Sequence, residues 1–192
     1  MIVMKFGGSS VASAEAIRRV TSIVAARKDR RPAVVVSAMG KTTDRLLEIG
    51  ASAVGGHRQK ALDLLRQLED YHHQESGLAD GRVEALFAEL GELVRGLAVM
   101  GEMTPRSVDA LSSYGERLSS VVVTEAFRHA GLDAVHLDSR EVIITDDRHT
   151  HASPLFAETY AALAQRIPPL LDRQVVVMGG FIASRKDGVT TT

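Results

Sequence analysis

A lysine followed closely by paired glycines is the first group in the chain whose types and spacing could do chemistry. The sequence KFGGSS follows a short apolar run at the amino terminus. Because glycine has no side chain, its backbone N–H groups can approach a phosphate closely, with a cation beside them. The sequence therefore predicts a phosphate-binding turn, and a tight turn without a ligand is the alternative interpretation. The residues of this turn are Lys5, Phe6, Gly7, Gly8 and Ser9.

A second strand end, in the sequence AVVVSAMGKTTDRLL, looks at first like the phosphate loop of a nucleotide hydrolase. That loop needs a glycine five positions before Gly40, and the residue there is Val35, inside the apolar strand. The match therefore fails. The loop can still bind a ligand where the strand ends, with Ser37 and Thr43 as candidates. In the alternative interpretation, Thr42 or Thr43 only caps the helix that follows.

A third strand end has the same character, because the apolar sequence QVVVM runs into Gly179 and Gly180. The carboxyl ends of parallel strands meet at one edge of a sheet, which is where open α/β sheets bind ligands. If the three strands are neighbours, their small and hydroxyl residues form one shared rim. The sequence therefore predicts a single ligand site and not three separate turns.

Glu116 lies in the segment SSYGERLSS, which is unusually rich in small residues. Small side chains permit close approach of another backbone or a ligand, so this segment would hold a carboxylate against a packed surface. The alternative is a solvated pairing of Glu116 with Ser120 or Arg117 on the same helix.

The elements that must position these residues alternate between strand and helix. Apolar runs predict strands at 2–6, 33–36, 134–137, 142–145 and 174–178, and helical periodicity predicts helices between them. Thr104 and Pro105 indicate a helix start, and Gly131 follows its end. Ser153 and Pro154 predict the start of a last helix, which Pro168 and Pro169 should terminate. The fold class is α/β, with a mostly parallel sheet sandwiched by helices.

A helical insertion is expected at about residues 55–103. Leucines and other apolar residues recur there at helical spacing, and Gly77 and Asp80-Gly81 divide the stretch into two antiparallel helices.

Composition excludes several classes of protein. The net charge of −1 and the scattered basic residues give no field that would attract nucleic acid or an anionic membrane. The chain has no cysteine, which excludes disulfides and thiolate metal sites, and no apolar run approaches membrane-spanning length. A cytoplasmic protein is expected. His72 and His73 are neighbours on a helix and point in different directions, and His149 and His151 lie in a polar loop without a third ligand. We interpret all four as structural or solvent-facing.

Taken together, these motifs resemble the aspartate kinases, within the amino-acid kinase fold. The segment KFGGSSV is similar to the first-strand motif of that family, with Ser9 where threonine is usual. SAMGKTTD resembles the second loop, GERLS the acidic helix motif, and GFI with the final threonines the approach to a fourth motif. The signals occur in the family's order along the whole chain.

The resemblance implies ATP-dependent phosphorylation of the side-chain carboxylate of L-aspartate, the first step of lysine, threonine and methionine biosynthesis. That carboxylate has a pKa of about 3.9 and is ionised at neutral pH, so no general base is needed. By motif position, Lys5 neutralises the transferred phosphoryl group and the amides of Gly7, Gly8 and Ser9 line the phosphate path. Glu116 would bind the substrate ammonium, and Thr43 with Ser37 a substrate carboxylate. Mg²⁺ would arrive with ATP, without a dedicated metal site.

The sequence departs from the family after Thr192, where a Leu-Gly-Arg-Gly-Gly-Ser-Asp stretch, a nucleotide lobe and regulatory domains would follow. We therefore expect residues 1–192 to be the amino-terminal lobe of a longer enzyme, inactive alone and homo-oligomeric at full length. One alternative is a non-catalytic substrate-binding or assembly module. Another is a sibling kinase for glutamate, acetylglutamate, carbamate or a nucleoside monophosphate, although Glu116 favours an acceptor with a free ammonium group.

Overall fold

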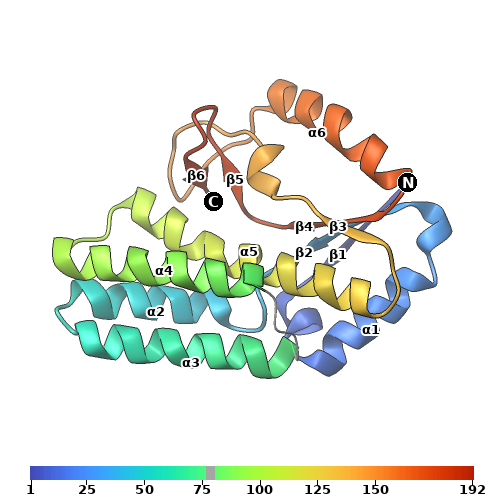
Figure 1. Cartoon of the computed structure of the whole chain (residues 1–192). Helices are drawn as coiled ribbons and strands as arrows, with labels where there is room; N and C mark the ends of the chain where they lie inside the picture. Colours follow the sequence, from blue (N-terminus) through green and yellow to red (C-terminus); the bar gives the residue numbers. More distant parts are fainter. Residues whose placement is uncertain (77–80) are drawn as a thin grey trace.

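A computed structural model describes residues 1–76 and 81–192. Its centre is a parallel sheet with the strand order β1-β2-β4-β3 (Figure 1). The strands are β1 (Ile2–Phe6), β2 (Pro32–Val36), β4 (Val175–Gly179) and β3 (Ala134–His136). The three strands predicted to share a rim are therefore neighbours, and the expected α/β class is confirmed.

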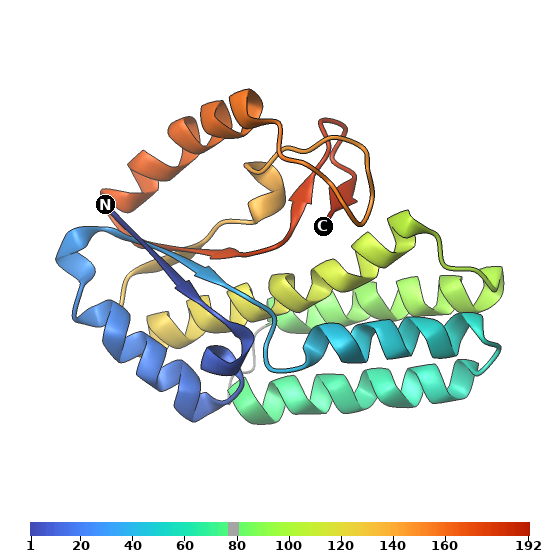
Figure 2. The same ribbon diagram turned by 180° about the vertical axis from the view of Figure 1, so that it is seen from behind.

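Helices cover both faces of the sheet because successive strand residues point to opposite sides. Val34, Val36 and Val177 pack in one core with α1 (Ala14–Ala25) and α5 (Pro105–His129). Val176 and Met178 pack in a second core with Ile167 and Leu171 of α6 (Phe156–Leu171). Figures 1 and 2 show α6 on one side of the sheet and α1 with α5 on the other.

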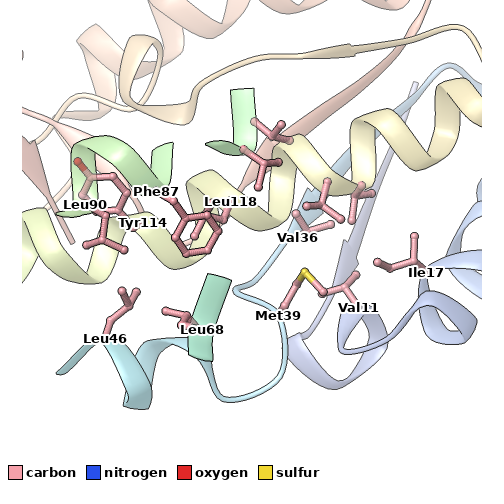
Figure 3. Close-up of a cluster of buried hydrophobic side chains, with 14 of the residues drawn as sticks. Val11, Ile17, Val36, Met39, Leu46, Leu68, Phe87, Leu90, Tyr114 and Leu118 are labelled. Atoms are coloured by element: carbon pink, nitrogen blue, oxygen red, sulfur yellow. The ribbon is translucent and has the colours of Figure 1, made fainter. Parts of the chain in front are cut away.

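The stretch expected to be helical contains α3 (Arg58–Ser76) and α4 (Gly81–Met100), which pack with α2 (Thr42–Val54) and α5. Gly77 and Asp80, part of the predicted break, lie outside the described residues. Leu68, Phe87 and Leu90 from these helices join the core of the sheet, as Figure 3 shows. None of the described helices is long and apolar enough to cross a membrane.

The start of α5 follows the predicted capping. The hydroxyl of Thr104 accepts a hydrogen bond from the backbone N–H of Ser107 at 3.2 Å, and Pro105 occupies the first turn, where its missing N–H is not needed. The helix ends at His129, two residues before Gly131.

Two predictions around α6 are wrong. Residues 142–145 form no strand and make only isolated bridges, from Ile144 to Ser184 and from Thr145 to Pro154. The helix starts at Phe156, and Pro168 and Pro169 lie inside its last turn instead of ending it. The helix continues because Ile167 and Leu171 bury their side chains against the sheet, which offsets the backbone hydrogen bonds that proline cannot donate.

Short elements complete the carboxyl edge of the sheet. A 3-10 turn, η1 (Gly8–Val11), follows β1, and another, η3 (Ser139–Glu141), follows β3. A third, η2 (Lys28–Arg30), precedes β2 at the opposite edge. After β4 the chain forms an antiparallel hairpin of β5 (Ala183–Ser184) and β6 (Thr190–Thr191).

Candidate functional site

The three predicted strand ends meet at one edge. Phe6, Val36 and Gly179 are direct neighbours across β1, β2 and β4. The ladder continues one step beyond the strands, because the N–H of Ser37 donates to the carbonyl of Phe6 at 3.1 Å and that of Gly180 to the carbonyl of Val36 at 2.7 Å. The shared rim is therefore present.

Gly8 lets the loops after β1 and β2 touch. A Cβ atom at this position would lie 2.6 Å from the carbonyl oxygen of Ala38 and 3.1 Å from that of Gly40. The N–H of Gly40 donates to the carbonyl of Gly8 at 3.0 Å, and Gly40 has a left-handed φ of 53°. The glycine motif thus fixes the spacing of the first two loops.

Gly7 differs from Gly8, because a Cβ atom added to it would meet nothing within 4 Å. The side-chain position of Gly7 therefore faces open space just before η1, two residues from the exposed Ser9. An anion could therefore reach the backbone of Gly7 without displacing protein atoms.

Lys5 is the exposed penultimate residue of β1. Met4 and Phe6 pack in the core that contains α5, so Lys5 leaves the sheet on the opposite face. Within residues 1–76 and 81–192, its ammonium group has no ion pair and no hydrogen-bond partner. The structure does not bring Lys5 into contact with Glu116. Glu116 lies on the α5 side of the sheet, and Lys5 leaves the sheet on the opposite side.

Glu116 is 5% exposed and lies on the face of α5 that meets the rim. One of its carboxylate oxygens accepts a hydrogen bond from the N–H of Ala38 at 3.2 Å. On the other side, a Cβ atom on Gly179 would lie 3.0 Å from the Cβ of Glu116. Glu116 thus lies between the second and third rim segments.

Burial raises the pKa of Glu116 from 4.5 to about 7, an effect that hydrogen bonds from the backbone N–H groups of Ala38 and of Glu116 itself partly oppose. Among the described residues no lysine or arginine pairs with this carboxylate. The alternative solvated pairing is wrong: Arg117 pairs with Glu89 at 2.8 Å, and the hydroxyl of Ser120 donates to the main-chain carbonyl of Glu116. The missing counter-charge makes Glu116 a candidate for binding a cationic ligand.

The hydroxyl candidates of the second loop lie beside Glu116. A Cβ atom on Gly115 would be 3.5 Å from the hydroxyl of Thr43. The carbonyl of Ser37 accepts from the hydroxyl of Ser119 at 2.8 Å, which ties this loop to α5. Within the part of the chain that the structure describes, the hydroxyls of Ser37 and Thr43 have no hydrogen-bond partner.

The capping alternative for Thr42 and Thr43 is wrong. Lys41 is the capping residue of α2, and no side chain caps that helix. Thr42 is fully buried and donates to the carbonyl of Met39 at 2.6 Å. Thr43, half-buried beside Gly115, remains available to a ligand.

Sequence reasoning assigned no role to Phe181, which follows the third rim segment, or to Asp109, which lies nearer the start of α5. Phe181 has a left-handed φ of 59° and is 71% exposed, although a non-glycine side chain is strained there. Asp109 is fully buried on α5, two helical turns before Glu116. The spacing of seven residues places Asp109 on the same helix face as Glu116, which the sequence could have revealed. The partners of Asp109, however, lie far away in the sequence.

Within the described residues there is no group of three or more histidine, cysteine, aspartate or glutamate side chains that could hold a metal ion. His72 is buried and donates to the carbonyl of Leu68 at 2.8 Å, while His149 contacts Asp109. The rim offers backbone amides, hydroxyls, the carboxylate of Glu116 and the exposed lysines Lys5 and Lys41, a set suited to an anionic or zwitterionic small molecule.

Comparison with known proteins identifies the family of this chain. Residues 1–191 match the model of the amino acid kinase family. Aspartokinase 1 of Arabidopsis thaliana is 36% identical over 99% of this chain, and lysine-sensitive aspartokinase 3 of Escherichia coli is 30% identical over 100% of it. The chain spans only 35% and 43% of those relatives, respectively.

A solved structure of E. coli aspartokinase III, described as a complex with aspartate and ADP in the R-state, superimposes over 100% of this chain and 43% of its own. The TM-score is 0.88 at 30% sequence identity. Because the family model matches residues 1–191 and the E. coli structure superimposes over the whole chain, this chain belongs to the amino acid kinase family.

Proposed function

We propose that this chain is the amino-terminal lobe of an aspartate kinase, which transfers the γ-phosphoryl group of ATP to the side-chain carboxylate of L-aspartate. The product, an acyl phosphate, would enter lysine, threonine and methionine biosynthesis. The observation that carries the proposal is Glu116, a buried carboxylate without a cationic partner in the described residues, at the rim beside the glycine loops. An amino-acid acceptor carries the ammonium group that such a carboxylate would bind.

The reaction needs no general base, because an aspartate side chain with a pKa of about 3.9 is already a carboxylate at neutral pH. The obstacle is repulsion between this anion and the phosphates. The exposed ammonium of Lys5 would lower it from one face of the sheet, and the backbone amides of Gly7, Gly8 and Ser9 would hold the phosphates at the edge. The open space around Gly7 fits such a role. Mg²⁺ bound to ATP would neutralise further phosphate charge.

Glu116 would bind the ammonium group of aspartate from the opposite face. Because burial raises the pKa of this carboxyl to about 7, part of the protein carries it protonated at neutral pH when no ligand is bound. A cation beside it favours the charged form, so ammonium binding would release a proton. Ser37 and Thr43, next to Glu116, would donate hydrogen bonds to a carboxylate of the substrate. The acceptor would then lie between α5 and the second loop, with its reactive group over the edge.

The relatives are longer than this chain, and we propose that the remaining groups needed for turnover, including the nucleotide lobe, belong to a longer polypeptide. The same proposal includes a homo-oligomeric, cytoplasmic enzyme. A non-catalytic binding or assembly module and a sibling kinase are the competing outcomes of the experiment below.

The test uses hydroxylamine, which traps acyl phosphates as hydroxamates. The chain with its natural continuation is incubated with Mg-ATP and, separately, with aspartate, glutamate, N-acetylglutamate or carbamate. We expect hydroxamate or ADP formation with aspartate alone among these acceptors, and none from residues 1–192 by themselves. Turnover with N-acetylglutamate, which lacks the ammonium group, would reject the role of Glu116. Absence of turnover with every acceptor would favour the non-catalytic module.

A further inference from the structure

The threonine run that follows the last charged turn is held by three side-chain hydrogen bonds. The hydroxyl of Thr190 accepts from the guanidinium of Arg140 at 3.2 Å, and that of Thr191 lies 2.8 Å from the hydroxyl of Thr145. The hydroxyl of Thr192 donates to a carboxylate oxygen of Asp109 at 2.5 Å. Each bond comes from a different segment, so the position of this run is set by tertiary contacts and not by β6 alone.

Asp109 is the most buried of these anchors. Its side chain is fully buried, and it has no lysine or arginine partner among the described residues. Besides the hydroxyl of Thr192 it accepts from the N–H of Thr150, at 3.0 and 3.1 Å to its two oxygens, and from the ring Nδ1 of His149 at 2.6 Å. All of these partners donate, and a carboxylate side chain only accepts. An asparagine of the same shape would direct its NH₂ group at one of the donors.

The segment from Gly179 to Thr192 is thereby fixed to α5 at two points. At its start, Gly179 packs directly on the backbone and Cβ of Glu116. At its end, Thr192 binds Asp109, seven residues earlier on the same helix, which is about 10 Å along the helix axis. Figures 1 and 2 both show β6 above α5, and the two elements are in contact. The hairpin therefore lies along the same helix face that carries Glu116.

We propose that Asp109 is a positioning residue for the acceptor site. By holding Thr192 it fixes the β5–β6 hairpin against α5, and with it the Gly179–Phe181 segment that closes one side of Glu116. The inference rests on the proposed function, since it assigns the affected site to the amino-acid acceptor. The loops after β1, which we assign to the phosphates, are bonded to the β2 loop instead of the hairpin.

The test compares Asp109→Asn with the wild type in the chain with its natural continuation. We expect KM for aspartate to rise about tenfold, while kcat and KM for ATP change by less than about twofold, because a bond to a charged group is lost only on the acceptor side. Thr192→Val, which lacks the hydroxyl, should reproduce this pattern. Thr192→Ser, which keeps a hydroxyl to donate to Asp109, should have the kinetic constants of the wild type. If Asp109→Asn does not fold, the Thr192 pair alone decides the result.

The matched control is Asp146→Asn. Asp146 accepts from the N–H groups of Ser153 and Arg148, so it orders the same loop as His149 and Thr150 but makes no side-chain bond to the hairpin. We expect no change in KM for aspartate in this variant. A rise equal to that of Asp109→Asn would mean that loop order alone matters and would overturn the inference.

Hydrogen exchange on the same proteins distinguishes the anchoring of the hairpin from its effect on the acceptor site. Amide exchange of residues 183–192 should accelerate at least about tenfold in Asp109→Asn, with β1 and β2 unchanged. Unchanged exchange in the hairpin would overturn the anchoring role, and equal changes in both KM values would overturn its link to the acceptor. A wild-type protein that does not phosphorylate aspartate would reject the proposed function, and the acceptor role of Asp109 with it. Activity in the wild type with an unaltered KM in Asp109→Asn would reject the inference alone.

Discussion

Glu116→Gln is expected to stabilise the folded chain at neutral pH. In the folded protein, burial raises the pKa of Glu116 from 4.5 to about 7. An acid whose folded pKa is raised contributes stability that is present below its unfolded pKa and lost as pH rises through the folded value. The shift of about 2.5 pH units corresponds to about 3.5 kcal/mol at most, at about 1.4 kcal/mol for each unit. Glutamine keeps an acceptor for the N–H of Ala38 but carries no charge to bury.

The measurement is the free energy of unfolding in urea for both proteins between pH 4 and pH 8. The variant should match the wild type near pH 4.5 and exceed it by about 1–3 kcal/mol above pH 7. His72 titrates in an overlapping range in the opposite sense, because burial lowers its pKa from 6.5 to about 4. The difference between variant and wild type cancels that contribution.

The control is Glu15→Gln, which removes an exposed carboxylate that pairs with Arg19 on α1. Its effect should stay within about 0.5 kcal/mol at every pH. A constant difference between Glu116→Gln and the wild type across the whole range would refute the claim that a buried charge is the cause. A wild type favoured over the variant at pH 8 would refute the sign.

Two further predictions use matched pairs. Lys5→Ala should lower kcat/KM for the phosphoryl transfer by about 100-fold or more with the fold intact, because a transition-state cation is removed. The control Lys28→Ala, at the opposite edge of the sheet, should leave kcat/KM within about twofold of the wild type. Equal rates for the two variants would contradict the role of Lys5. Gly8→Ala should lower the free energy of unfolding by about 2 kcal/mol, because its Cβ would lie 2.6 Å from the backbone oxygen of Ala38. The control Gly7→Ala, whose Cβ meets nothing within 4 Å, should change that free energy by less than about 0.5 kcal/mol. Similar losses of unfolding free energy for the two variants, measured in denaturant, would show that the loops are not closely packed.

The sheet and most helices were predictable because local signals and tertiary packing agree there. The valine runs of β2 and β4 are apolar at every position, as strands covered on both faces must be, and Thr104 with Pro105 marks the start of α5. Residues 142–145 have the same apolar character but pair only through isolated bridges, one of them from Ile144 to Ser184 of β5, while Val142 and Ile143 pack in the core beside α6. Pattern alone does not distinguish these two cases.

At the site, the residue types were predictable and their surroundings were not. The small residues around Glu116 indicated close packing, but the missing counter-charge depends on Arg117 turning to Glu89 on another helix. Asp109 escaped notice because its partners His149, Thr150 and Thr192 are 40 to 83 residues away. The left-handed backbone at Phe181 carries no sequence signal, since glycine is the residue expected at such a φ.

The position of β1 at the end of the strand order has a consequence for handling the protein. Its outer row of backbone N–H and carbonyl groups has no strand beside it in the described sheet, and Met1 and Val3 are 70% and 62% exposed on one face. An apolar border of this kind is a template for pairing with another polypeptide. Self-association of concentrated solutions should therefore begin at β1, and a lysine in place of Val3 should suppress it.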